Sequence, residues 1–106
     1  MVQKIDWTSR ARGDLRKIYD YIAEDSVRYA QVQVESIQSA VLNLSEFPSI
    51  GRRVPEFPHL TYREIIVGNY RVIYRFEEQL EHVLILSIVH GRQLLKTPPS
   101  TAEIAG

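Results

Sequence analysis

The sequence contains no cysteine, which excludes a disulfide scaffold, a thiolate zinc site and a cysteine nucleophile. It also lacks a long apolar run. The longest, Val83 to Val89, is interrupted by Ser87 and is far too short to span a bilayer. The opening residues, Met1 to Asp6, show no apolar signal segment. We therefore expect a protein of the reducing cytoplasm that has no membrane partner.

Neither sign of charge is in excess, because 13 lysines and arginines balance 13 aspartates and glutamates. Generic nucleic-acid-binding proteins usually carry a basic excess, so the composition weighs mildly against that class. The charges are nevertheless unevenly placed. Five arginines and only two glutamates lie between Arg52 and Arg75, and three glutamates follow between Glu77 and Glu81. The segment from Arg52 to Arg75 can therefore form a local positive surface on a neutral protein.

The length of 106 residues and the hydrophobic content of 44% predict one globular domain with its own core. We place this domain at residues 1–95. Residues 96–106 contain two consecutive prolines and no periodic apolar pattern, so they are interpreted as a loose C-terminal tail.

Apolar periodicity predicts a short strand, two helices and three further strands. The first strand covers residues 2–7, and Thr8 or Ser9 can cap the first helix. Asp25 or Ser26 can cap the second helix, which ends before Pro48. Residues 48–60 read as an irregular surface loop, and strands are predicted at 62–67, 70–76 and 82–89. The order β-α-α-β-β-β predicts an α+β fold in which a helical hairpin packs on one face of an antiparallel sheet.

The pair Gly68-Asn69 is a good two-residue hairpin turn, and it fixes a register in which Val67 pairs with Tyr70. Paired side chains share a face of the sheet. The mostly apolar face, predicted to lie under the helices, holds Arg63, Ile65, Val67, Tyr70, Val72 and Tyr74. The opposite, more polar face holds Glu64, Ile66, Arg71, Ile73 and Arg75.

The register places Glu64 within diagonal reach of Arg71 and Arg75. One interpretation is a cross-strand salt-bridge ladder on a solvated face of the sheet. The other is a general base beside arginines that bind phosphate. Spacing alone favours the ladder.

The histidines give a weaker signal. His90 ends the buried strand in the sequence His90-Gly91-Arg92, where side chains leave the core and become available for chemistry. A lone histidine at a strand end is structural more often than not. Histidines 59, 82 and 90 do not have the spacing of metal ligands, so we expect neither a metal site nor a cofactor.

Several segments resemble, in order, the conserved pieces of the RelE/ParE superfamily of toxins. They are IDWT at 5–8, ARGDL at 11–15, FPSIGR at 47–52, YREI at 62–65, GNYRVIYR at 68–75 and IVHGR at 88–92. Together they extend from about Ile5 to Leu95. The resemblance implies the toxin of a type II toxin–antitoxin module, sometimes called a plasmid stabilisation protein. It also implies a small antitoxin that wraps the toxin with a disordered segment, in a toxin–antitoxin hetero-oligomer.

The family divides by target. RelE-like members cleave mRNA on the ribosome, whereas ParE-like members block DNA gyrase and are not nucleases. If this chain is RelE-like, the resemblance implies that Glu64 or His90 accepts the 2′-hydroxyl proton. Arg71, with Arg63 or Arg92, would then stabilise the charge that develops on phosphate.

The resemblance favours the ParE-like branch. The lysine-rich cluster of RelE-type nucleases is missing, no tyrosine follows the last strand, and the closing His90-Gly91-Arg92 resembles ParE-like members. On this interpretation the chain is not an enzyme, and its arginines bind a protein target. These target-binding candidates are Arg52, Arg53, Arg63, Arg71, Arg75 and Arg92. A non-toxic structural relative is the third alternative. Buried Leu15 or Ile18 is expected to belong to the core and not to the antitoxin-binding surface.

Overall fold

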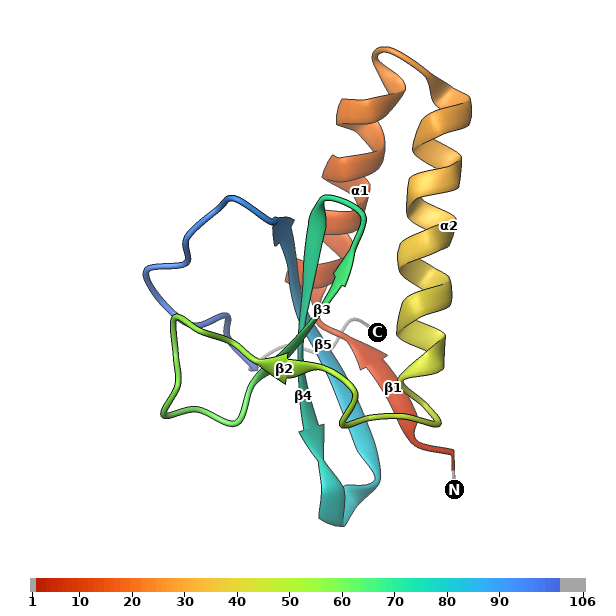
Figure 1. Ribbon diagram of the computed structural model, residues 1–106. Helices are drawn as coiled ribbons and strands as arrows, with labels where there is room; N and C mark the ends of the chain where they lie inside the picture. Colours follow the sequence, from red (N-terminus) through yellow and green to blue (C-terminus); the bar gives the residue numbers. More distant parts are fainter. Residues whose placement is uncertain (1, 102–106) are drawn as a thin grey trace.

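The strand order places the first and last strands of the chain side by side (Figure 1). The computed structural model describes residues 2–101. The elements are β1 (Lys4–Trp7), α1 (Ser9–Ala23), α2 (Val27–Asn43), β2 (Arg52–Arg53), β3 (Arg63–Val67), β4 (Tyr70–Glu77), a 3-10 turn (Glu78–Leu80) and β5 (His82–His90). One sheet has the order β1-β5-β4-β3-β2. The predicted α+β class is therefore confirmed, and α1 and α2 form the expected hairpin.

The sheet is mixed, so the prediction of a wholly antiparallel sheet was wrong at one edge. β1 runs parallel to β5, with Lys4 opposite His82 and Trp7 opposite Ile85. The physical reason is the direction of the chain. β3, β4 and β5 reverse at each turn, so β5 points the same way as β3, and β1 enters from the same end of the sheet (Figure 1). The residue pattern of β1 carries no sign of which strand it will meet.

β2 is a second departure from the sequence prediction, because it lies in the segment predicted as an irregular loop. Its two residues pair with β3, Arg52 opposite Glu64 and Arg53 opposite Arg63. Gly51 permits this approach, since a Cβ atom there would lie 2.6 Å from the Tyr74 hydroxyl and 2.7 Å from the Glu64 carbonyl oxygen. No side chain fits in that space.

Both helices begin at the predicted caps. The Thr8 hydroxyl accepts a hydrogen bond from the Ala11 N–H at 3.1 Å, and the Ser26 hydroxyl accepts one from the Tyr29 N–H at 3.1 Å. Each cap satisfies a backbone donor that has no partner within its helix. No helix within residues 2–101 is long and apolar enough to cross a membrane.

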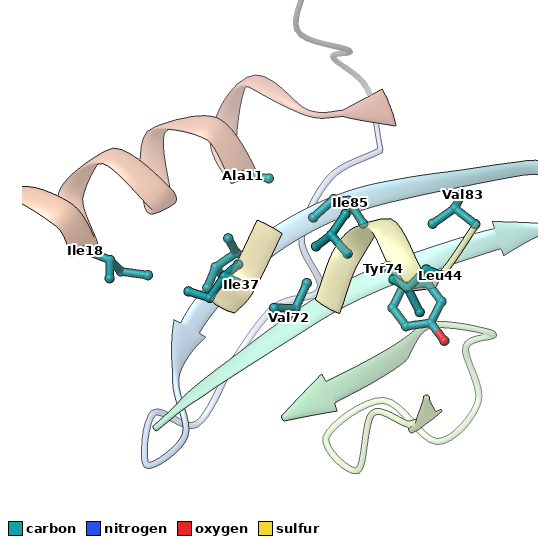
Figure 2. Packing of buried hydrophobic residues seen from close by; sticks show 10 residues of the cluster. Ala11, Ile18, Ile37, Leu44, Val72, Tyr74, Val83 and Ile85 are labelled. Atoms are coloured by element: carbon teal, nitrogen blue, oxygen red, sulfur yellow. The ribbon is translucent and has the colours of Figure 1, made fainter. Parts of the chain in front are cut away.

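The main core lies between the helical hairpin and the sheet (Figure 2). Its buried residues come from both helices and from β4 and β5, and they are Ala11, Ile18, Ile37, Val41, Leu44, Val72, Tyr74, Val83, Ile85 and Ile88. Ile65, Val67 and Tyr70 pack against them. The predicted hairpin register is confirmed at all five pairs from Arg63–Tyr74 to Val67–Tyr70, and its apolar face lies under the helices as expected.

A bulge interrupts the pairing of β4 with β5, because Ile73 faces Ser87 while Tyr74 faces Ile85. Such a bulge leaves backbone groups without ladder partners. Helix α1 and its cap supply those partners. The Thr8 hydroxyl donates to the Leu86 carbonyl at 3.0 Å, and an Asp14 carboxylate oxygen accepts from the Ile88 N–H at 3.0 Å and the Ser87 hydroxyl at 2.7 Å. These contacts fix α1 over β5.

Candidate functional site

The face of the sheet opposite the helices, which we call the second face, was predicted to be solvated but is covered by other parts of the chain. Ile73 on β4 is fully buried there. It belongs to a second apolar cluster with Val54, Phe57, Leu84, Leu86, Val89 and Leu95. The cover comes from the irregular segment between β2 and β3 and from the segment after β5. The predicted cross-strand ion pair of Glu64 with Arg71 forms, but the expectation that it lies on a solvated face was wrong, because two segments without secondary structure pack there.

Arg71 lies at the centre of a cluster of charged side chains under this cover, and its side chain is only 5% exposed. Its Nε donates to Glu64 Oε1 at 2.8 Å. Its two terminal nitrogens donate to the two oxygens of Glu56, Nη1 to Oε2 at 2.8 Å and Nη2 to Oε1 at 2.6 Å. Nη1 also donates to the Gln93 carbonyl oxygen at 2.9 Å. The guanidinium of Arg71 is thus occupied on every side.

Arg52 completes the group, which we call the Arg71 cluster and define as Arg52, Glu56, Glu64 and Arg71. The Nε of Arg52 donates to Glu64 Oε2 at 2.7 Å, so the two oxygens of Glu64 each contact a different arginine. The Glu64 side chain has no exposed surface, whereas 65% of the Arg52 side chain is exposed. Two arginines and two glutamates give the cluster no net charge, which is how buried charges become tolerable.

The cluster joins three parts of the chain. Glu56 comes from the segment between β2 and β3, Arg71 from β4, and Glu56 Oε2 also accepts from the Leu95 N–H at 3.0 Å. Farther along, the Tyr62 hydroxyl donates to the carbonyl of buried Pro99 at 3.2 Å. The first part of the predicted tail therefore contacts the domain. Residues 102–106 lie outside the described residues, and the domain boundary at residue 95 stays a prediction.

Electrostatic interactions keep the pair of Glu56 and Arg71 ionised at neutral pH. Hydrogen bonding to Arg71 lowers the pKa of Glu56 to about 2, against the opposing effect of burial. The hydrogen bond to Glu56 likewise raises the pKa of Arg71. Because guanidinium groups contact both oxygens of Glu64, a substrate hydroxyl cannot reach this carboxylate unless the cluster opens.

A cleft of about 480 Å³ borders the cluster. Its lining residues are Arg52, Pro55, Glu56, Ile66, Arg71, Gly91 and Leu94. Ile66 and Leu94 are exposed beside it, at 56% and 79%. The cleft is therefore a mixed apolar and charged surface, and the charges facing it are already paired.

His90 does not join Glu64 and Arg71. It pairs with Tyr70 across β4 and β5, and the two rings meet edge to face with centroids 5.7 Å apart. Paired residues share a face, and Tyr70 packs against the core under the helices. His90 therefore lies at the sheet end on the helix side, while Glu64 and Arg71 lie on the opposite side. The three candidate catalytic residues do not form one constellation.

The remaining candidate arginines serve different contacts. Arg63 donates to the Gly51 carbonyl at 2.7 Å, and Arg53 donates to the Leu60 carbonyl at 3.0 Å. Arg75 pairs with Glu77 on its own strand, so the predicted reach of Glu64 to Arg75 is not used. Within residues 2–101 the exposed side chain of Arg92 has no ion pair. The sequence prediction missed Glu56, whose only signal was its position as an acid in an arginine-rich stretch.

A second hollow, about 650 Å³, lies on the other side of the molecule and was not predicted. We call it the helix groove. Its lining comes from β1, α1 and α2, namely Ile5, Trp7, Arg12, Leu15, Arg16, Tyr19, Val34, Gln38, Val41 and Leu42. Leu42 is 68% exposed, and Arg12 and Arg16 are exposed on successive turns of α1. Ile18 is buried in the core as expected, whereas partly buried Leu15 both packs on the core and lines this groove.

No group of three histidine, cysteine, aspartate or glutamate side chains within the described part of the chain is arranged to hold a metal ion. The Arg71 cluster itself offers carboxylate and guanidinium groups. Such a set can bind an anion, hold a proton or join segments of the chain, and the observed hydrogen bonds use it for the last of these.

Comparisons with known proteins give a consistent picture. The family model for the ParE toxin of type II toxin–antitoxin systems (parDE) matches residues 5–95. Toxin RelE2 and Toxin ParE3 of Caulobacter vibrioides are both 34% identical to this chain. The matches cover 86% of the chain and 98% of RelE2, and 83% of the chain and 86% of ParE3.

Two solved structures share the fold. The toxin–antitoxin complex RelBE2 from Mycobacterium tuberculosis matches with a TM-score of 0.64 at 22% identity, over 85% of this chain and 99% of the matched chain. The chromosomal ParDE system from P. aeruginosa matches with a TM-score of 0.67 at 24% identity, over 84% and 96%. Similarity thus extends to both named branches.

Proposed function

Since the chain belongs to the family of ParE toxins, and is the toxin of a type II toxin–antitoxin system, we propose that it arrests growth by binding DNA gyrase and that it does not cleave RNA. On this proposal the protein is a binding protein and not an enzyme. Its activity is held in check by a cognate antitoxin until that antitoxin is lost.

The burial, pairing and positions of the candidate catalytic residues support this proposal. A general base must come within hydrogen-bond reach of the proton that it removes. Glu64 is completely buried and contacts two guanidinium groups. Arg71 is likewise buried and fully paired, and His90 lies on the opposite side of the sheet. For these three residues to form an RNA-cleaving site, the segments that cover Glu64 and Arg71 would have to move away. His90 would also have to lie on the same side of the sheet as Glu64 and Arg71.

The exposed arginines fit a contact with a large acidic or mixed protein surface. Arg52 exposes 65% of its side chain while it stays anchored to Glu64, so its position is fixed but its outer face is available. Arg53 and Arg92 are also exposed. Arginine is enriched at the energetically important positions of protein interfaces because it combines charge with a planar, weakly hydrated group. We place the gyrase contact around Arg52 and Arg53, at the β2 edge of the sheet.

We place the antitoxin on the helix groove. The groove presents apolar side chains, including exposed Leu42, and two arginines stand at its rim. An amphipathic segment with acidic residues beside its apolar positions matches this surface in both shape and charge. Two solved structures with this fold are described as toxin–antitoxin systems from M. tuberculosis and P. aeruginosa, which supports a partner of that class.

The test is expression of the chain without its antitoxin, followed by assays on the purified protein. We expect growth arrest with filamentation and DNA damage signalling, and inhibition of gyrase supercoiling by the purified protein. Addition of the antitoxin should restore both growth and supercoiling. A purified, folded protein that leaves gyrase supercoiling unchanged would rule out the gyrase proposal. Absence of growth arrest would indicate a non-toxic relative.

The second candidate is a ribosome-dependent mRNA endonuclease. Two observations support it: the 34% identity to Toxin RelE2, and a cleft that is lined by Arg52 and Arg71. Primer extension on mRNA after induction separates the two candidates. New transcript ends that require ribosomes would support the endonuclease, whereas intact transcripts during full growth arrest would exclude it.

A further inference from the structure

The arrangement of Glu56 on Arg71 has the geometry of anion recognition. Two parallel hydrogen bonds, at 2.6 and 2.8 Å, join the two carboxylate oxygens of Glu56 to the two terminal nitrogens of the guanidinium. Arginine binds two oxygens of a phosphate group in the same two-pronged manner. The Glu56 carboxylate therefore occupies the place on Arg71 that a phosphate would take.

Glu56 also stands between Arg71 and the solvent. The side-chain exposure rises from 0% at Glu64 to 5% at Arg71 and 14% at Glu56. The charged residues that line the adjacent cleft are Arg52, Glu56 and Arg71. An anion entering the cleft would pass exposed Arg52 and would be repelled by the Glu56 carboxylate, which occupies the terminal nitrogens of Arg71.

Glu56 differs from Glu64 in the element that holds it. Glu64 is fixed in β3 by strand pairing on both sides, with Arg52 on β2 and Ile73 on β4. Glu56 lies in the irregular segment between β2 and β3, outside the sheet ladder. Removal of its charge leaves Arg71 with Glu64 and leaves the cluster with one unbalanced positive charge.

We propose that Glu56 is an internal blocking group, whose carboxylate occupies a phosphate-binding position formed by Arg71 and Arg52 and so keeps phosphate groups out of the cleft. The ligand class is a phosphate oxyanion, either free or in the backbone of a nucleic acid. This inference goes beyond the gyrase proposal and does not depend on it. It states that the guanidinium groups which suit RNA binding are neutralised from within the chain.

The test is Glu56→Gln in the full-length purified protein, compared with wild type and with Glu46→Gln. Glu46 is exposed, so its substitution makes the same change in net charge away from the cleft. Binding is measured by calorimetry with inorganic phosphate and by fluorescence anisotropy with a short single-stranded RNA. We expect phosphate to bind E56Q at least about tenfold more tightly than it binds wild type or E46Q, because the group on the terminal nitrogens of Arg71 loses its negative charge.

The two probes distinguish the sources of the phosphate. Tighter binding of both probes to E56Q indicates a site that accepts a nucleic-acid backbone, whereas tighter binding of inorganic phosphate alone indicates a site for a free anion. The double variant E56Q/R52Q should lose much of the gain, since Arg52 lines the same cleft. Equal affinities of E56Q and E46Q, or no effect of R52Q, would overturn the proposal.

A structural role of Glu56 is the competing explanation, because its carboxylate also accepts from the Leu95 N–H. Cooperative thermal unfolding is therefore measured for E56Q and for a second variant, Glu56→Ser, which removes the carboxylate and leaves more room for phosphate. If neither variant folds, the carboxylate is an indispensable part of the interior, and the idea of a displaceable blocking group is wrong.

Discussion

Arg71 and Glu56 lie 15 positions apart in the sequence, yet the two oxygens of the carboxylate meet the two terminal nitrogens of the guanidinium at 2.6 and 2.8 Å. This pair, together with Glu64, lies between the sheet and the segments that cover it. The sequence predicted an open arginine surface here, whereas the structure shows a buried cluster without net charge.

The first prediction concerns Arg71 itself. Replacing Arg71 with Gln leaves Glu56 and Glu64 without their shared counter-ion, and removal of one partner from a buried ion pair costs about 3–5 kcal/mol. Urea unfolding at neutral pH measures the change in the free energy of unfolding. Arg28→Gln on exposed α2 is the control, and it should stay within about 0.5 kcal/mol of wild type. Equal stability of the two variants would show that the cluster contributes nothing to the fold.

The second prediction concerns pH. The pKa of Glu56 falls from 4.5 to about 2 on folding, chiefly through its hydrogen bond to Arg71. A carboxyl with a lowered pKa in the folded state stabilises the protein above its unfolded pKa. That contribution, about 3 kcal/mol at most, is lost as pH falls from roughly 5 towards 2. Urea unfolding across this range should show a smaller decline for Glu56→Gln than for wild type. Parallel curves for the two proteins would contradict the assignment.

The third prediction concerns the main core. Ile18 is 9% exposed and packs between α1 and the sheet (Figure 2). Ile18→Ala should lower the free energy of unfolding by about 2–5 kcal/mol, since it removes buried methyl groups and leaves a cavity. Leu80, 72% exposed in the turn before β5, supplies the control Leu80→Ala. Chemical denaturation of both variants checks the difference, and a near-neutral I18A would place Ile18 outside the core.

The fourth prediction concerns the helix groove and the antitoxin. Leu42 lines the groove and is 68% exposed, so Leu42→Gln should leave the free energy of unfolding nearly unchanged. It should weaken antitoxin binding at least about tenfold, because a central apolar contact is lost. Leu80→Gln removes an equally exposed leucine elsewhere and should bind normally. Calorimetry with the purified antitoxin measures both, and unaltered affinity of L42Q would move the interface away from the groove.

The fifth prediction concerns Thr8, whose hydroxyl both caps α1 and donates to the Leu86 carbonyl at the bulge. Thr8→Ala removes the cap and leaves a buried carbonyl unpaired, so we expect a loss of about 2–4 kcal/mol. Ser26 is an exposed cap without such a second bond, and Ser26→Ala should cost about 1 kcal/mol. Thermal or urea unfolding compares the two. Equal losses would show that the contact with β5 adds nothing.

Local chemistry allowed much of this fold to be predicted. The Gly68-Asn69 turn fixed the register of β3 and β4, because a two-residue turn leaves little freedom and a slip by one residue would turn every apolar side chain to the wrong face. The helix caps followed from the preference of serine and threonine for those positions. These features depend on residues close together in the sequence.

The features that were missed depend on residues far apart. Asp14 meets Ser87 across 73 positions, and β1 meets β5 across the whole domain. Irregular segments cover Ile73, and they have no apolar periodicity from which their packing on a sheet could be predicted. For the candidate site, the sequence predicted that Glu64 and Arg71 would meet. It could not show that Glu56 and Arg52 would neutralise them, or that His90 would lie on the other side.

The pairing of β1 with β5 has a consequence for biosynthesis. β1 is an edge strand whose neighbour in the sheet is β5, and β5 ends at His90. A ribosome releases the chain from its N-terminus, so β1 emerges first and stays unpaired until nearly the whole chain has been made. A translation product that stops before His82 lacks the strand on which both apolar clusters are built. We therefore expect a message interrupted before His82 to yield no folded domain.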